Sequence, residues 1–182
     1  MKGKIILKGL FAPYIALIIR FAMMLLIYQI LRVGFYIYNV DQFPHVTFSE
    51  MIRMMSGGLK FDLAALFYLN SLYILMMAIP LPFKYKASYQ KVAKWVFIIT
   101  NSIGIGLNLI DYAYYPFTLK RTTGTVFSQF ANEQNLFNLM TDFLIGYWYL
   151  LLEFVVIVWV LIKLYDLIKI EYKRFTGWTF YT

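Results

Sequence analysis

Charged side chains inside long apolar stretches are the residues of this sequence with the clearest chemical potential. Arg20 and Glu153 are each the only charge in such a stretch, about nine or ten residues from one end of it. With a helical rise of about 1.5 Å per residue, both side chains are predicted to lie about 14 Å deep, near the membrane midplane. A lone charge at that depth is costly, so we expect Arg20 and Glu153 to form a structural ion pair. A proton or ion pathway is the alternative.

A second group of polar residues is predicted to line a pocket near the outer leaflet. Helical spacing places some of them on shared faces, and the cations stand just outside the apolar stretches, beside several threonines. Cations beside hydroxyls suit a phosphate, while amides and carboxylates suit glycerol hydroxyls or an amine. The alternative is hydrogen bonding between helices, with basic side chains reaching the interface. The candidate headgroup-binding residues are Lys60, Asp62, Asn70, Asn108, Asp111, Lys120 and Arg121.

Sequence motifs of soluble enzymes are missing. The chain has no glycine-rich dinucleotide loop, no P-loop, no His-Glu-x-x-His zinc motif and no Gly-x-Ser-x-Gly nucleophile motif. His45 is the only histidine, and the sequence contains no cysteine. We therefore predict no catalytic residue, metal site or cofactor within these residues, and the isolated chain is not expected to be an enzyme.

The composition indicates an integral membrane protein. Of the 182 residues, 62% are apolar and only 14% are charged, whereas about 25% are charged in typical soluble domains. A water-soluble globular domain, a disordered chain and a disulfide-rich domain are all excluded by these values. The net charge of +8 is then better explained by membrane topology and anionic lipid than by a nucleic-acid partner.

Four apolar stretches are long enough to cross a bilayer core of about 30 Å as helices. We therefore predict an all-α membrane protein, in which one domain forms a bundle of four transmembrane helices. Pro116 is predicted to end the third helix near Tyr115. The predicted spans are residues 10–31, 63–83, 95–115 and 143–162.

Both predicted outer loops contain an amphipathic segment, at residues 47–56 and 124–141. Thr47 and Glu50 have the spacing of a capping box, which marks a helix start, and Gly57 and Gly58 are predicted to end that helix. Apolar residues at helical spacing predict that both segments are helices lying in the membrane interface. Short elements packed over the ends of the spans are the alternative.

Lysine and arginine are distributed unequally between the two sides of the predicted bundle. One side collects eleven of them, from the two termini and the loop after the second span, and the other side collects five. Because basic residues favour the cytoplasmic side, we predict that both termini are cytoplasmic. Loops 32–62 and 116–142 then lie outside.

Two sequence stretches carry a resemblance to a known family. They are Gly-Leu-Lys-Phe-Asp-Leu-Ala-Ala at 58–65 and Asn-Leu-Ile-Asp-Tyr-Ala-Tyr-Tyr-Pro-Phe-Thr-Leu-Lys-Arg-Thr-Thr at 108–123, with Tyr-Trp-Tyr following at 147–149. Together they resemble the N-terminal transmembrane region of the lipoteichoic acid synthase-like proteins. These are phosphoglycerol and phosphoethanolamine transferases of the alkaline phosphatase/sulfatase superfamily. The resemblance covers nearly the whole chain.

The resemblance implies five spans in a bacterial cytoplasmic (inner) membrane, followed by an extracytoplasmic domain with a threonine nucleophile and a divalent metal. This sequence stops after its fourth predicted span, so the resemblance implies a piece that lacks the catalytic domain. Its implied role is to anchor that domain and to present a phospholipid of the outer leaflet. A small transporter or channel subunit and a noncatalytic scaffold are the alternatives, although the sequence shows no internal repeat or broken-helix pair. The oligomeric state is open.

Overall fold

The computed structural model describes residues 5–80, 82–120 and 145–171. The predicted all-α class is confirmed, with the addition of a small two-stranded sheet. In chain order the elements are β1 (Ile5–Lys8), α1 (Ala12–Tyr38), η1 (Val40–Gln42), α2 (Phe48–Leu69), α3 (Ser71–Ala78), η2 (Pro82–Tyr85), α4 (Ala87–Thr118), α7 (Trp148–Leu167) and β2 (Ile168–Glu171).

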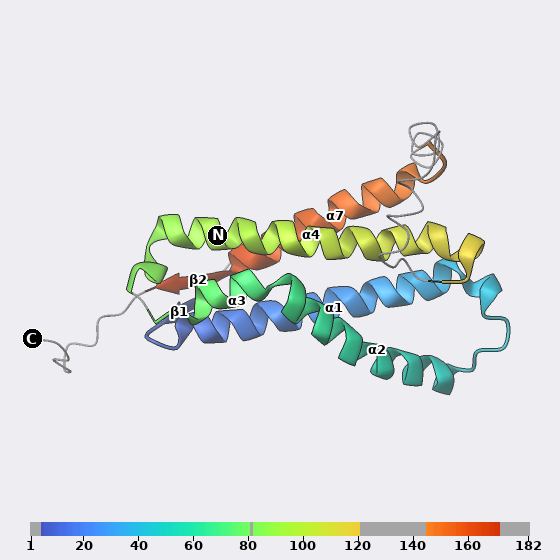
Figure 1. Cartoon of the computed structure of the whole chain (residues 1–182), viewed down its shortest axis with the longest axis horizontal. Helices are drawn as coiled ribbons and strands as arrows, with labels where there is room; N and C mark the ends of the chain where they lie inside the picture. Colours follow the sequence, from blue (N-terminus) through green and yellow to red (C-terminus); the bar gives the residue numbers. More distant parts are fainter. Residues whose placement is uncertain (1–4, 81, 121–144, 172–182) are drawn as a thin grey trace, which may run out of the picture.

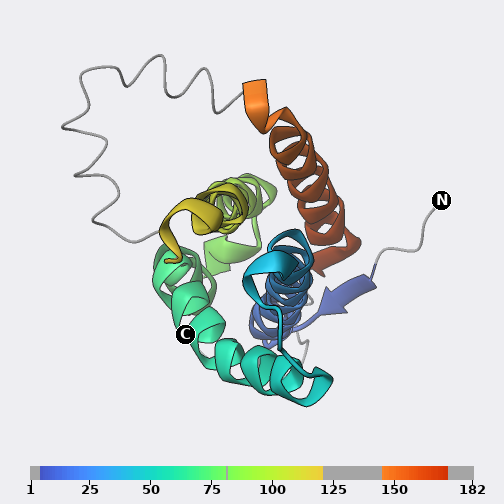
Figure 2. The same cartoon turned by 90° about the vertical axis from the view of Figure 1, so that its right-hand side faces the viewer.

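The helices form an elongated bundle. Helices α1 and α4 run in one direction along its long axis, and α2, α3 and α7 return beside them (Figure 1). Viewed from one end, α1 lies between α2 and α7 (Figure 2). Helix α1 contacts α2, α3 and α4, while α7 packs mainly on α4. At the far end from the sheet, α2 diverges from the other helices (Figure 1).

Within the described parts of the chain, two helices, α1 and α4, are long and apolar enough to cross a membrane. Helices α2 and α3 meet these criteria only together, and they are bent by 67° at the break between them. The structure therefore supports a membrane protein with two candidate spans, or three if the bent pair counts as one, and the predicted four spans are not confirmed. The fourth predicted span corresponds largely to α7, which carries Glu153, Lys163 and Asp166.

The predicted capping box at the start of α2 is confirmed. The side chain of Thr47 accepts from the backbone N–H of Glu50, and the Glu50 carboxylate accepts from the backbone N–H of Thr47 at 2.8 Å. The prediction that Gly57 and Gly58 end this helix is wrong, because α2 continues to Leu69. Gly58 instead provides space, since a Cβ there would overlap the guanidinium of Arg32. The second predicted interfacial segment, 124–141, lies outside the described residues.

Pro116 does not end α4 near Tyr115, because the helix continues to Thr118 and closes at Leu119 with a left-handed φ of 53°. Proline has no N–H, so within a helix it leaves the carbonyl four residues earlier without its usual donor. Here that carbonyl belongs to Tyr112, and the side-chain amide of Asn39 approaches it at 3.4 Å. A donor from the end of α1 thus compensates for the proline.

The small sheet joins the two ends of the described chain. Strands β1 and β2 are parallel, with Ile5 opposite Ile168 and Leu7 opposite Ile170. β-branched isoleucines favour this extended conformation. Gly9, at φ 106°, lets the chain reverse between β1 and α1, a conformation that costs glycine little. Residues 5–8 and 168–171 therefore lie at the same end of the bundle.

Gly104 allows α1 to approach α4 closely. A Cβ at this position would overlap the hydroxyl of Tyr28 and lie 3.0 Å from a methyl group of Leu69. Tyr28 is buried, and its hydroxyl has no hydrogen-bond partner among the described residues. The absence of a side chain at Gly104 is therefore a packing requirement.

We predict that Gly104→Ala destabilises the bundle by roughly 1–3 kcal/mol, because the added methyl group overpacks the contact with Tyr28. Thermal unfolding in detergent measures the change. Gly57→Ala is the matched control, since a Cβ at Gly57 meets nothing within 4 Å. Tyr28→Phe removes the clashing oxygen and should restore much of the loss. Equal melting temperatures for Gly104→Ala and the wild type would contradict this packing role.

Candidate functional site

Arg20 is buried in a cage of groups that are formally uncharged. Its Nη1 donates to the hydroxyl of Tyr73 at 2.7 Å, and its Nη2 donates to the carbonyl of Ile168 at 3.0 Å. The guanidinium carbon lies 3.6 Å from the ring centroid of Tyr165, a distance at which a cation–π attraction operates. These contacts tie α1 to α3 and to the junction of α7 with β2.

The predicted ion pair between Arg20 and Glu153 is wrong. Glu153 precedes Ile168 by 15 residues, which corresponds to about 22 Å along a helix. Because Arg20 contacts Ile168, it lies near the end of α7 that is remote from Glu153. Arg20 is closer to the sheet end of the bundle than its position in the apolar stretch indicated, and carbonyl, hydroxyl and aromatic groups there replace the expected carboxylate.

Asp62 forms a polar cluster with two residues of α1. Arg32 Nη2 donates to Asp62 Oδ1 at 2.6 Å, and Gln29 Nε2 donates to Asp62 Oδ2 at 3.0 Å. The side chains of Arg32 and Asp62 are only 19% and 11% exposed, so most of the pair is removed from solvent. The Nε of Arg32 is buried without a partner among the described residues. This cluster therefore retains one unsatisfied donor.

Asn70 lies at the break between α2 and α3 and is fully buried. Its amide pairs reciprocally with that of Asn101 on α4, at 3.0 and 2.8 Å. Each amide also donates to its own helix, Asn70 to the carbonyl of Leu66 and Asn101 to that of Phe97. The paired amides therefore hold the helix break against α4.

The structure does not gather the predicted headgroup residues into one pocket. Asn70 is level with Asn101, and Asp111 lies ten residues further along α4, a distance of about 15 Å. Asn108 donates to the carbonyl of Gly104 in its own helix, and Asp111 is buried. Lys60 and Lys120 are exposed. Arg121 lies outside the described residues.

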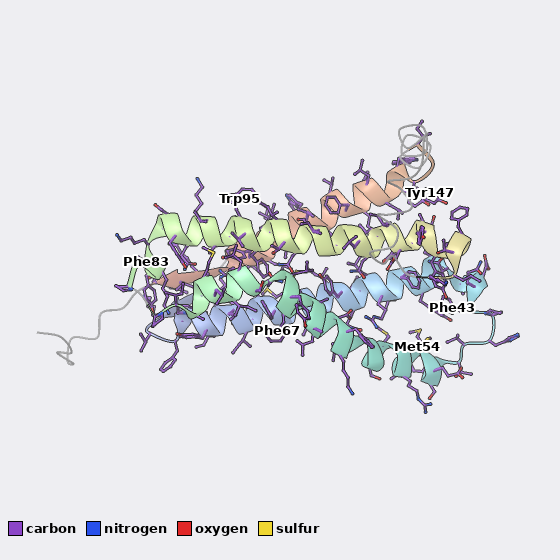
Figure 3. The ribbon with its side chains drawn as sticks, viewed as in Figure 1. Phe43, Met54, Phe67, Phe83, Trp95 and Tyr147 are labelled. Atoms are coloured by element: carbon purple, nitrogen blue, oxygen red, sulfur yellow. The ribbon has the colours of Figure 1, made fainter. Side chains whose placement is uncertain are left out.

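Two neighbouring hollows lie instead at the end of the bundle where α1 connects to α2. The larger, of about 480 Å³, is lined by apolar residues such as Phe43 and Val46 together with the polar residues Gln42, His45, Glu50 and Arg53. The smaller, of about 150 Å³, is lined by Arg32 and by apolar residues such as Met51 and Met55. Phe43 and Met54 line both hollows, and Figure 3 shows these two residues at this end of the bundle.

His45 faces the larger hollow, but it does not complete a metal site within the described residues. No group of three His, Cys, Asp or Glu side chains close enough to hold a metal ion occurs across 5–80, 82–120 and 145–171. Glu50, the nearest acid in the lining of this hollow, is engaged in the capping box. His45 and Glu50 therefore give no basis for a metal centre at this hollow within the described residues.

Sequence reasoning missed Arg32 and Gln29 as partners of Asp62. Arg32 stood just beyond the predicted first span, whereas α1 continues to Tyr38 and places it opposite Asp62. Arg32 also follows Gln29 by three residues, so both share a helical face. This spacing was the available signal, and it needed the correct end of the helix to be informative.

Comparisons with models of protein families, with curated proteins and with solved structures found no match to this chain. The resemblance to the lipoteichoic acid synthase-like transferases therefore remains an expectation from the two quoted sequence stretches. The geometry of the polar clusters and hollows is a second basis for proposing a function, and it does not depend on that resemblance.

We predict that Asp62→Leu destabilises the bundle by about 3 kcal/mol, because it leaves the cation of Arg32 largely buried without its carboxylate. The double variant Arg32→Met with Asp62→Leu should regain most of this stability, since both charges are then replaced by apolar groups. The melting temperatures of the single and double variants, measured in the same detergent, test this prediction. A double variant no more stable than Asp62→Leu would contradict the pairing.

Proposed function

We propose that this chain is the phospholipid-binding membrane domain of a phospholipid-headgroup transferase. The observation that carries the proposal is the position of Arg32, whose side chain lines a mainly apolar hollow while its guanidinium pairs with Asp62. Arginine presents several N–H donors in one plane and matches the oxygens of a phosphate. A phosphate at the mouth of this hollow would accept from guanidinium N–H groups of Arg32 that Asp62 does not use.

The transferase part of the proposal comes from the sequence resemblance. In this proposal the chain anchors an extracytoplasmic catalytic domain in a bacterial cytoplasmic membrane, and that domain supplies the nucleophile and the divalent metal. The positive-inside distribution then places the α1–α2 connection toward the outer leaflet. Phosphoglycerol and phosphoethanolamine are the two headgroups consistent with the resemblance. The substrate-presenting residue is Arg32, in place of the dispersed set expected from the sequence.

Lipid retention measured by native mass spectrometry tests this function. The chain is extracted from nanodiscs that contain equal amounts of phosphatidylglycerol and phosphatidylcholine, and retained phospholipids are counted. The double variant Arg32→Met with Asp62→Leu should retain about tenfold less phospholipid, because the phosphate loses its cation. Lys94→Met with Asp166→Leu is the matched control, since it removes another ion pair, at 2.7 Å, between α4 and α7. Equal retention by both double variants would exclude Arg32 as the phosphate ligand.

A small transporter or channel subunit is the second candidate, favoured by the bent α2–α3 pair. The sequence did not predict a broken helix, but the structure has one, bent by 67° with Asn70 at the break. Interrupted helices are common at the substrate sites of transporters. All four polar atoms of the two side-chain amides in the Asn70–Asn101 pair, however, are already engaged with protein atoms. The break therefore provides no free ligand among these groups.

Ion and proton flux into liposomes separates the two candidates. We predict that liposomes containing the chain show the same leak as empty liposomes, because the amides at the break are satisfied and both described hollows lie at one end of the bundle. Asn101→Ala provides the internal check. A wild-type flux above background that Asn101→Ala abolishes would favour the transporter.

A further inference from the structure

Three methionines are grouped near the start of α2. Met54 and Met55 follow Met51 by three and four residues, so the three side chains lie on one face of the helix. All three line the smaller hollow, of about 150 Å³. The capping box of Thr47 and Glu50 fixes the helical turn that precedes Met51. One ordered helix therefore brings three thioether side chains to the same hollow.

Core packing does not account for these three methionines. Met24 and Met77 are completely buried in the core of the bundle, and Met23 and Met76 pack against that core. Among the described residues, the methionines near the start of α2 belong to neither group, and Met54 is 44% exposed. Their side chains are therefore accessible to a ligand that enters the hollow.

We propose that Met51, Met54 and Met55 bind a soft monovalent metal ion, with copper(I) as the natural ligand. Histidine, cysteine and acidic side chains form most metal sites in proteins, and thioethers are a separate class of ligand that selects softer ions. The inference goes beyond the proposed function, because all three metal ligands belong to α2, whereas the proposed phosphate ligand is Arg32 of α1.

The chemistry of the lining selects the ion. Thioether sulfur is a soft and uncharged ligand that favours copper(I), whereas magnesium and calcium prefer oxygen ligands. Methionine has three rotatable side-chain bonds, so sulfurs on one helical face can turn toward a common ion. No carboxylate is among the residues that line this hollow, and a divalent ion would lack a compensating charge there. The hollow is also smaller than the typical small-molecule site of about 300–1,000 Å³, which suits a single ion.

The remaining side chains around the hollow are compatible with a cation. Phe35, Tyr36 and Phe43 border it, and the faces of aromatic rings attract cations. Arg32 also borders it, but Asp62 Oδ1 matches the charge of its guanidinium at 2.6 Å. A monovalent ion among the three thioethers therefore meets no unmatched positive charge in the lining.

Metal titration of the full chain in phosphatidylcholine nanodiscs tests the proposal. Silver(I) is titrated by calorimetry in chloride-free buffer, because it shares the soft monovalent chemistry and does not change its oxidation state. Copper(I) is added without oxygen, in competition with the chelator bicinchoninate. We expect one high-affinity ion per chain above the blank of empty nanodiscs, and magnesium should not compete for it.

Leucine variants identify the ligands, because leucine removes the sulfur and nearly preserves the side-chain volume. Met54→Leu should weaken the binding of both ions about tenfold, and the triple leucine variant of Met51, Met54 and Met55 should bind neither above the blank. Met23→Leu with Met76→Leu is the matched control, since neither residue lines the hollow. Melting temperatures show whether each variant is folded.

The X-ray absorption spectrum of the copper(I)-loaded wild type provides a readout that does not require a variant. It should show sulfur neighbours around the ion. A shell of only nitrogen and oxygen neighbours would overturn the proposal, as would equal affinities of Met54→Leu and the control variant. His45→Gln should leave the affinity unchanged, because His45 lines only the larger hollow, and a loss of binding would assign the ion to His45 instead. Met54→Leu should retain as much phospholipid as the wild type, so the metal site and the proposed function can fail separately.

Discussion

Inside a helical bundle surrounded by lipid, each polar side chain must find its partners within the protein, because hydrocarbon offers none. That requirement organises this structure. Arg20 uses a hydroxyl, a carbonyl and an aromatic ring, while Asp62 uses an arginine and a glutamine. Asn70 and Asn101 use each other. Each solution joins different elements, so the polar groups also determine which helices pack together and at what level.

The same requirement separates structural polar groups from candidates for ligand binding. The amides at the α2–α3 break are satisfied on every side, and they explain how a helix can be interrupted inside the bundle. Arg32 differs in its position, because its side chain lines a hollow, whereas Arg20 is enclosed by α3, α7 and β2. The candidate site therefore follows from where this cation lies and not from charge alone.

Features determined by local sequence were predictable, and features determined by tertiary packing were not. The capping box needs only Thr47 and Glu50, so its spacing was sufficient. To predict the partners of Arg20, one needed to know where α7 ends. Arg20 contacts Ile168, which follows Glu153 by 15 residues, and this separation excludes the ion pair between Arg20 and Glu153. Gly58 was interpreted as a helix end because glycine usually weakens helices, whereas here it makes room for Arg32. Pro116 was tolerated because Asn39, distant in sequence, approaches the affected carbonyl.

The pairing of β1 with β2 has a consequence for biogenesis. Ile5 and Ile168 are neighbours in the sheet, but Ile168 is translated 163 residues after Ile5. During translation, Arg20 enters the bundle long before the carbonyl of Ile168 exists to accept from it. Until α7 is in place, a nascent chain must keep that cation hydrated or engaged elsewhere. The β1–β2 pair and the Arg20–Ile168 hydrogen bond therefore both form only after α7 has been made.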